Sequence, residues 1–536
     1  MTTSARRALQ DIHFESTVVE ALPGDPQFEN VPRQVPEAAY TFVAPTAVAA
    51  PSLLAWSDDL AERLGLERPP SKGAAVDILA GNTLAPGMRP YAARYGGHQF
   101  GNWAGQLGDG RAITLGELIA LDGSRQELQL KGAGPTPYSR FADGRAVLRS
   151  SLREFLCSEA MYHLGVPTTR ALSLVSTGEQ VVRDMFYDGH PQPEPGAIVC
   201  RVAPTFIRFG NFEIHAASDE HAILRRLVDH VIRVHYPIFD ADDPATPAAW
   251  FAEICRRTAV MIAHWMRVGF VHGVMNTDNM SILGLTLDYG PYGWLEGYDP
   301  QWTPNTTDAS GRRYCYGNQP QIALWNLARL AGALMPIIED RDALQEGLEL
   351  YRRTYSATWQ GLLAAKLGFE SIDREGDAAL VDELFSLMST VETDMPIFFR
   401  TLGEHLVDAE GRLSEARLIE QVLEPALYDA GQCSAALRAR WQAWFSKWCA
   451  RGEASGLEAS ARQQLMNAHN PCYVPRNYLA QGAIDAAAQG NLEPLEALLT
   501  VLRRPYERQP GREAYEARRP EWARHRAGCS ALSCSS

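Results

Sequence analysis

One segment, residues 270–290, carries side chains that could bind a metal ion and move a proton. Asn279 and Asp288 offer carboxamide and carboxylate oxygens, the hard ligands that Mg²⁺ takes in sites that handle phosphates. Asp278 lies directly before Asn279, and His272 lies earlier in the same segment. These residue types could bind a divalent metal ion, and a carboxylate is available to accept a proton.

The order of these residues resembles the catalytic loop and the metal-binding turn of protein kinases. On the pattern H-R-D-L-x-x-x-N followed by D-F-G, His272 matches the histidine, Asn279 the metal-binding asparagine and Asp288 the metal-binding aspartate. Val274 stands where a kinase has its catalytic base. Because valine cannot accept a proton, either another residue does so or the chemistry differs from phosphoryl transfer.

A lysine on a predicted strand is the second feature with possible chemistry. Only four of the 50 basic residues are lysines, and Lys131 ends an alternating run over 127–131 that predicts a strand. A helix predicted over about 145–161 carries Glu154, the best-placed partner for that lysine. Taken alone, Lys131 could be a solvated strand end and Glu154 a surface glutamate.

A glycine-rich turn over residues 105–111 precedes the strand-like run 112–115. Glycines let backbone N–H groups approach phosphate oxygens, although the same glycines would suit any hairpin turn. A long helix is predicted over about 248–268, and an apolar helix is predicted to begin near residue 318. The order of turn, lysine strand, glutamate helix and metal segment is that of a kinase from end to end.

Composition limits the class of protein. Of the 536 residues, 46% are hydrophobic and 21% charged, which is typical of a globular chain with a large core. No run approaches the roughly 20 apolar residues of a membrane span, and a net charge of −14 argues against binding nucleic acid. The nine cysteines lack zinc-like spacing, and the acidic N-terminal residues do not form a secretion signal. We therefore expect a monomeric bacterial protein of the cytoplasm, or an organellar one if the source is eukaryotic.

We expect an α+β chain with the two-lobed fold of protein kinases and an extension at each end. Residues 1–85 are expected to form an N-terminal extension, 86–215 the small lobe and 216–430 the large helical lobe. Residues 431–510 are expected to form a helical extension and 511–536 a tail. Amphipathic helices are predicted within the extension, where tryptophans at helical spacing should serve as core.

Five runs of this sequence are distinctive: Tyr91-Ala-Ala-Arg-Tyr-Gly-Gly-His-Gln-Phe-Gly-Asn-Trp, Leu130-Lys-Gly-Ala-Gly-Pro-Thr-Pro-Tyr-Ser-Arg, Asn276-Thr-Asp-Asn, Asn318-Gln-Pro and Asn470-Pro-Cys-Tyr-Val-Pro-Arg-Asn. They closely resemble the selenoprotein O family, whose members are kinase-fold protein adenylyltransferases, and the similarity covers nearly the whole chain. The resemblance implies transfer of AMP from ATP to Ser, Thr or Tyr hydroxyls of other proteins. It also implies Mg²⁺, or Mn²⁺ in its place, an ATP molecule flipped relative to kinases, and a link to redox homeostasis.

The resemblance assigns a role to each candidate residue. It implies that ATP contacts Gly108, Gly110, Arg111, Lys131, Asp143, Gly144, Arg201, Arg208 and Asp288. Glu154 would hold Lys131, and Asn279 and Asp288 would coordinate the metal. Asp278 would be the proton acceptor that replaces the carboxylate missing at Val274.

Some of these assignments have ordinary structural alternatives. Adenylyl transfer expels pyrophosphate, and Arg201 and Arg208 suit the binding of its phosphates because guanidinium groups bind phosphate bidentately. Both could instead be structural arginines paired with acids, and Asp278 could cap a loop by bonding local amides.

The cysteines near the C-terminus are candidates for redox chemistry. Cys534 lies where some members of the resembling family carry selenocysteine, and other members join a C-terminal cysteine to one in the loop after the metal turn. This chain offers Cys315 for that loop but departs from the family's usual position, and Cys529 is an equal candidate for the partner. A tail with inert thiols is the alternative.

Three functions remain open at this point. A protein adenylyltransferase is favoured because Val274 removes the kinase base while the metal ligands persist. A protein kinase that uses Asp278 as its base is the second, and a noncatalytic ATP-binding pseudokinase scaffold is the third. Replacing Asp278 should stop turnover in either enzyme and leave a scaffold unaffected.

Overall fold

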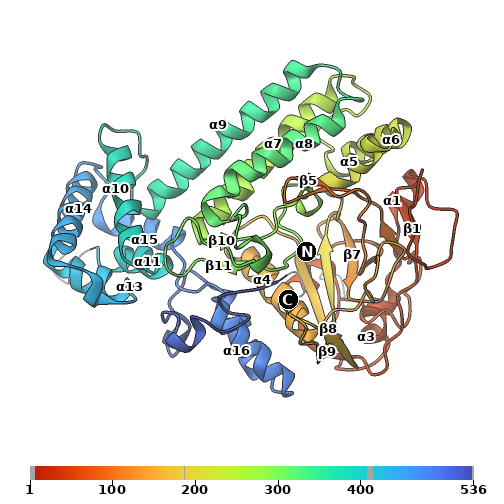
Figure 1. Cartoon of the computed structure of the whole chain (residues 1–536), viewed down its shortest axis with the longest axis horizontal. Helices are drawn as coiled ribbons and strands as arrows, with labels where there is room; N and C mark the ends of the chain where they lie inside the picture. The colour runs from red at the N-terminus through yellow and green to blue at the C-terminus, as the bar shows by residue number, and fades with distance from the viewer. Residues whose placement is uncertain (1–5, 186–187, 407–414, 534–536) are drawn as a thin grey trace.

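The computed structural model describes residues 6–185, 188–406 and 415–533. A sheet-containing part ends with strand β9 (Gln192–Ala203), and most of the remaining chain forms a helical part (Figure 1). The mixture of helices and sheet predicted from the sequence is confirmed. Within the described residues, no helix combines the length and the apolar character needed to cross a membrane.

Seven antiparallel strands form the main sheet, in the spatial order β1-β3-β6-β7-β9-β8-β2. Besides β9 these are β1 (Tyr40–Phe42), β2 (Ser52–Trp56), β3 (Tyr91–Ala93), β6 (Ala112–Ile119), β7 (Arg125–Lys131) and β8 (Arg170–Arg183). The predicted strand ending at Lys131 is the central strand, β7. Its Leu128 and Leu130 are fully buried, so Lys131 and Gln129 project from the opposite face of the sheet.

Both edges of the sheet come from the first 85 residues. β1 pairs with β3 at one edge and β2 pairs with β8 at the other. The same stretch supplies the short helix α1 (Thr17–Ala21) and the helices α2 (Asp58–Leu64) and α3 (Ala74–Leu79). Helices α2 and α3 share a core with Leu128 and Leu130, so this stretch completes the sheet and covers one of its faces.

Helix α4 (Leu148–His163) covers the face of the sheet that carries Lys131. Its apolar side packs in one core with Val199, which lies opposite Lys131 on the neighbouring strand. The helix begins a few residues later than the sequence predicts, because Val147 remains extended and bridges Gly196. Helix α4 is therefore buried against the sheet, and its polar side chains lie next to the strands.

The helical part is built around a long central helix, α7, which packs on α8 and α9 (Figure 1). Its first helices are α5 (Phe209–Ala217), α6 (His221–His235), α7 (Thr246–Val268), α8 (Gln319–Leu334) and α9 (Arg341–Lys366). The long helix predicted from the sequence is α7. It carries a proline in its first turn and ends at Gly269, whose φ of +77° is the left-handed conformation that terminates helices.

The C-terminal helices form two groups. The first comprises α10 (Asp377–Thr390), α11 (Met395–Glu404), α12 (Glu415–Leu418), α13 (Glu424–Ala426), α14 (Ala435–Glu453) and α15 (Ala459–His469). Trp441, Trp444 and Trp448 of α14 are fully buried there, which confirms their predicted role as core. The second group, α16 (Asn477–Ala488) and α17 (Glu493–Leu502), packs against α4.

Candidate active site

A cavity of about 710 Å³ lies where the sheet meets the helical part. The cavity is lined by the glycine-rich turn with the end of β7, by residues 138–145 and 274–291, and by residues of the segment 95–100 together with Arg183 and Arg201. The cavity brings together Gly108, Gly110, Arg111, Lys131, Asp143, Gly144, Arg201, Asp278, Asn279 and Asp288. The two remaining nucleotide-site candidates, Glu154 and Arg208, contact members of this set directly.

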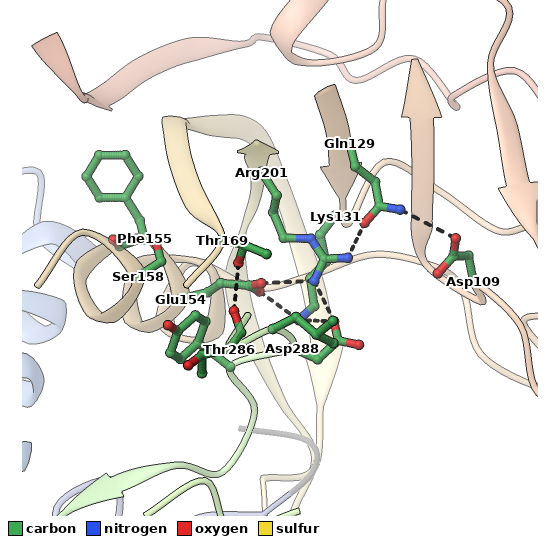
Figure 2. A network of polar contacts seen from close by, with 12 residues as sticks. Asp109, Gln129, Lys131, Glu154, Phe155, Ser158, Thr169, Arg201, Thr286 and Asp288 are labelled. Atoms are coloured by element: carbon green, nitrogen blue, oxygen red, sulfur yellow. Dashed lines mark hydrogen bonds and ion pairs between the residues drawn. The ribbon is translucent and has the colours of Figure 1, made fainter. Parts of the chain in front are cut away.

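A buried glutamate of α4 joins the cations of two neighbouring strands. The Lys131 Nζ lies 2.6 Å from Glu154 Oε2, and the Arg201 Nη1 lies 3.1 Å from Glu154 Oε1 (Figure 2). Gln129 lies opposite Arg201 in the register of β7 and β9, and its Oε1 accepts a hydrogen bond from Arg201. The contact predicted between Lys131 and Glu154 is therefore present, and the guanidinium of Arg201 is fixed from two sides.

Asp288 receives three cations. The Arg201 Nη1 lies 2.5 Å from its Oδ1, Arg208 donates to its Oδ2, and the Lys131 Nζ lies 3.8 Å away. Burial raises the pKa of Asp288, but the nearby charges of Arg208, Arg201 and Lys131 outweigh burial and hold it well below its usual range. Asp288 is thus an ionised carboxylate at the cavity wall.

Arg208, the residue that caps the N-terminus of α5, completes the cluster. Its Nη1 donates to the backbone carbonyl of Asp278 at 2.8 Å, and its Nη2 lies 3.8 Å from Asp109. Three cations therefore face three carboxylates, those of Glu154, Asp288 and Asp109. The structural alternative for the arginines, pairing with acids, is present in the structure, and Arg201 lines the cavity as well.

Asp278 lies in a short 3-10 turn (Thr277–Asn279) and is 7% exposed. Its Oδ2 accepts a hydrogen bond from Gln99 Nε2 at 3.1 Å, while its buried Oδ1 has no hydrogen-bond partner among the described residues. Burial raises the pKa of Asp278 to about 7, against the opposing effects of the Gln99 hydrogen bond and the Arg208 charge. A carboxylate with such a pKa can exchange a proton near neutral pH.

The rest of the catalytic loop is held by its own hydrogen bonds. Asn279 Nδ2 donates to the Val274 carbonyl at 2.9 Å, which fixes the orientation of the carboxamide. His272 Nε2 lies 3.0 Å from the Leu287 carbonyl, directly before Asp288. The histidine therefore joins this loop to the turn that carries Asp288, and the Val274 side chain offers no proton acceptor to the cavity.

The residues present fit a divalent metal ion between the loop and the turn. Asn279 and Asp288 both line the cavity, and hard oxygen ligands of this kind suit Mg²⁺. A second acidic group, Asp59 with Glu159 and His163, lies elsewhere. The Arg170 guanidinium lies 2.5 Å from Glu159 and 3.0 Å from Asp59. This arginine therefore already neutralises the carboxylates that a metal ion would need.

Gly108 allows the glycine-rich turn to approach its neighbours closely. Its φ is +89°, and a Cβ at this position would lie 2.4 Å from the Tyr138 ring. We therefore expect Gly108→Ala to weaken ATP binding by roughly tenfold, because the clash with Tyr138 would displace the backbone N–H groups of the turn from the phosphates. Isothermal titration with ATP would measure the change.

The matched control is Gly123→Ala. Gly123 has a similar φ of +82°, but nothing lies within 4 Å of a Cβ there, so the variant carries the backbone strain without the clash. It should lose stability and keep its affinity for ATP. Equal ATP affinity in the Gly108 and Gly123 variants would show that the turn does not contact the nucleotide.

Gln99 and Asp109 are polar residues of the cavity that were assigned no role from the sequence. Gln99 lies within a run that indicated the family, and Asp109 lies between the two glycines of the turn. Asp109 Oδ2 accepts from the Ala93 N–H at 3.1 Å, and Gln99 bonds Asp278. Both partners are distant in the sequence, so no local pattern could reveal these contacts.

No cysteine among the described residues lines the cavity. Cys315 and Cys529 are buried free thiols, and burial raises the pKa of Cys315 and raises that of Cys529 to about 11. Buried thiols with a raised pKa are poor nucleophiles. Cys534 lies outside the described residues.

Comparison with known proteins identifies the family. The family model described as "Protein adenylyltransferase SelO" matches residues 25–503. Proteins named "Protein nucleotidyltransferase YdiU" are 58% identical in Nitrosospira multiformis and 58% identical in Xanthomonas axonopodis pv. citri. These matches cover 98% of this chain and 97% and 99% of the two relatives. The protein of the same name from Aromatoleum aromaticum is 56% identical, and the match covers 98% of this chain and 100% of that protein. The chain therefore belongs to the protein adenylyltransferase SelO family and is a nucleotidyltransferase enzyme.

Proposed function

We propose that this enzyme transfers AMP from ATP to Ser, Thr or Tyr hydroxyl groups of other proteins in a Mg²⁺-dependent reaction. One observation carries the proposal: Asp278 lies in the same cavity as the charged cluster, whereas Val274 takes the place of the kinase base. A sheet with helix α4 inserted between strands β7 and β8, followed by a helical part, supports a kinase-like fold of two lobes. Relatives from bacteria support a bacterial setting, with the cytoplasm as the expected compartment.

We propose that ATP lies flipped relative to kinases, with its β- and γ-phosphates toward Arg201 and Arg208. Each of these side chains is 2% exposed, so the positive charge is deep in the site and largely shielded from water. Charge placed in such surroundings stabilises a developing anion more than charge in water does. Glu154 and Gln129 hold Arg201 before the reaction begins, which avoids reorganisation during it.

The proposed step is an attack on the α-phosphorus. The acceptor hydroxyl oxygen forms a bond to that phosphorus, and the bond from phosphorus to the oxygen bridging to the β-phosphate breaks. Pyrophosphate leaves with the electron pair, and Asp278 takes the hydroxyl proton. Lys131 and the two arginines offset the charge that gathers on pyrophosphate. A Mg²⁺ or Mn²⁺ ion, held by Asn279 and Asp288, would supply further charge neutralisation at the phosphates.

A protein kinase is the second candidate, because the contact of Lys131 with Glu154 is one that kinases use. The scaffold alternative does not fit a chain that belongs to a family of transferases. The two activities can be distinguished with labelled ATP. The protein is incubated with Mg²⁺, a mixed protein acceptor and ATP labelled at either the α- or the γ-phosphate. We expect α-label in the acceptor, whereas γ-label alone would replace the proposal by the kinase.

Glu154→Gln tests the charged cluster. Glu154 is 2% exposed and bonds both Lys131 and Arg201, so the variant leaves two buried cations with less compensating charge. We expect the free energy of unfolding to fall by about 3 kcal/mol, together with a clear loss of ATP affinity. Denaturant titration and calorimetry would measure the two effects.

Glu159→Gln is the matched control. Glu159 is a buried glutamate of the same helix and pairs with Arg170 at 2.5 Å, away from the cavity. This variant should lose stability to a similar extent and bind ATP as the wild type does. ATP affinity that falls equally in both variants would mean that the loss reflects α4 as a whole rather than Lys131.

A further inference from the structure

A small hairpin lies against the catalytic loop. Its strands are β4 (His98–Gln99) and β5 (Asn102–Trp103). The His98 N–H donates to Thr277 Oγ1 at 2.7 Å, and the Phe100 N–H lies 3.3 Å from Asn276 Oδ1. The hairpin therefore contacts the loop on the N-terminal side of Asp278 through its own backbone.

The base of the hairpin is fixed on the helical part. The Gly96 N–H donates to the Gly210 carbonyl of α5 at 3.0 Å, and His98 Nδ1 lies 2.7 Å from Glu213 Oε1. The His98 ring also lies 5.2 Å from that of Trp103 and 5.5 Å from that of Trp325, centre to centre. Because the residues on both sides of Gln99 are held by these contacts, the Gln99 side chain has a defined position.

Two residues of this segment enclose the carboxylate of Asp278. Asp278 Oδ1 is buried and faces Gly97, where an added Cβ would lie only 2.6 Å from it, so the backbone of Gly97 covers that oxygen. Gln99 Nε2 donates to the other oxygen, Oδ2, at 3.1 Å, and Gln99 and Asp278 both line the cavity. Oδ2 is therefore the oxygen through which Asp278 can meet a hydroxyl group.

We propose that Gln99 is a positioning residue for the transfer reaction, whose side-chain amide holds Oδ2 of Asp278 toward the acceptor hydroxyl. This inference rests on the proposed function of Asp278. A carboxylate oxygen has two lone pairs, so Oδ2 can accept the Gln99 amide and the acceptor hydroxyl together. One hydrogen bond then fixes the rotamer, and the second lone pair takes the proton in the step described above. Gln99 acts through Asp278 and not on the nucleotide.

The test uses the full chain and three variants. Gln99→Glu keeps the size of the side chain and removes the donor, and Gln99→Ala removes both. Gln463→Ala is the control, because the Gln463 side-chain amide also donates hydrogen bonds, at 3.1 Å to the carbonyls of Gly403 and Glu404, but lies in α15 and does not line the cavity. We expect kcat to fall roughly 10- to 100-fold in both Gln99 variants, with KM for ATP and the melting temperature close to wild type. The Gln463 variant should keep its kcat.

A double variant shows whether Gln99 works through Asp278. In the Asp278→Ala background, Gln99→Ala should cause no further loss of the residual rate, since the group that it positions is gone. A further loss as large as in the wild-type background would overturn the proposal, as would a Gln99→Glu protein with wild-type kcat. The assay follows label from the α- and the γ-phosphate of ATP together. Transfer of the γ-phosphoryl group alone would refute AMP transfer, and the rates of the Gln99 variants would still test the role of Gln99. A wild-type chain that transfers neither label would overturn both proposals.

Discussion

Replacing Asp278 by asparagine is expected to lower the rate of AMP transfer by about 10²- to 10⁴-fold, the range that proton transfer by a positioned group contributes. Asparagine has nearly the same size, and its carbonyl oxygen can still accept the hydrogen bond from Gln99. It cannot accept the hydroxyl proton. The loss should therefore appear in kcat, while ATP affinity and the melting temperature stay close to wild type.

Initial rates at saturating ATP, together with calorimetric titration of ATP, measure the two quantities separately. Asp122→Asn serves as the control, because Asp122 is an exposed aspartate that bonds Arg63 and Ser124 far from the cavity. The control should keep full activity. An Asp278→Asn protein with the wild-type rate would remove Asp278 from the mechanism and leave the loop-capping alternative.

Asp288→Asn is expected to lower the transfer rate by about 10³-fold and to destabilise the protein. The variant loses a proposed metal ligand, whose charge neutralisation contributes several kcal/mol to reactions at phosphate. It also leaves Arg201 and Arg208 facing an uncharged partner in a buried site. Breaking a buried ion pair in this way costs about 3–5 kcal/mol of unfolding free energy.

The stability difference should depend on pH in a defined direction. Because the pKa of Asp288 is lowered from 3.8 in the folded protein, its ionised form contributes stability above that value. This contribution disappears as the pH falls through the lowered pKa. Denaturant titrations without metal should therefore show the wild type and the variant converging at acidic pH.

Asp143→Asn is the comparison for this measurement. Asp143 also pairs with an arginine, Arg183, at 2.6 Å, but its side chain is 49% exposed. An exposed pair contributes no more than about 1 kcal/mol, so this variant should remain nearly as stable as the wild type. Equal stability of the Asp288 and Asp143 variants would contradict the charged cluster.

A few central elements could be predicted from the periodicity of apolar residues. The alternation over 127–131 identified the central strand, and the apolar spacing over 248–268 identified α7. Both could be predicted because an element buried on one face has apolar residues at a regular spacing. Lys131 could be singled out because lysine is rare in this chain. Its partner Glu154 followed from the predicted helix after the strand.

Contacts between distant segments could not be predicted in this way. Strands β1 and β2 are short edge strands, and nothing in a proline- and alanine-rich stretch indicates which strand each would pair with. The hydrogen bond from Gln99 to Asp278 joins residues 179 positions apart. Such contacts depend on the folded arrangement of the sheet and the helices, which local pattern does not specify.

Intact-mass spectrometry of an acceptor protein tests the central claim most directly. The full chain is incubated with Mg²⁺, ATP and a mixed protein acceptor, beside the Asp278→Asn and Asp288→Asn variants. We expect the acceptor to gain the mass of one or more adenylyl groups with the wild type and, over the same time, at least about 100-fold less modified acceptor with either variant. A gain of phosphoryl mass, or an adenylyl gain that persists at the wild-type level in both variants, would contradict this expectation.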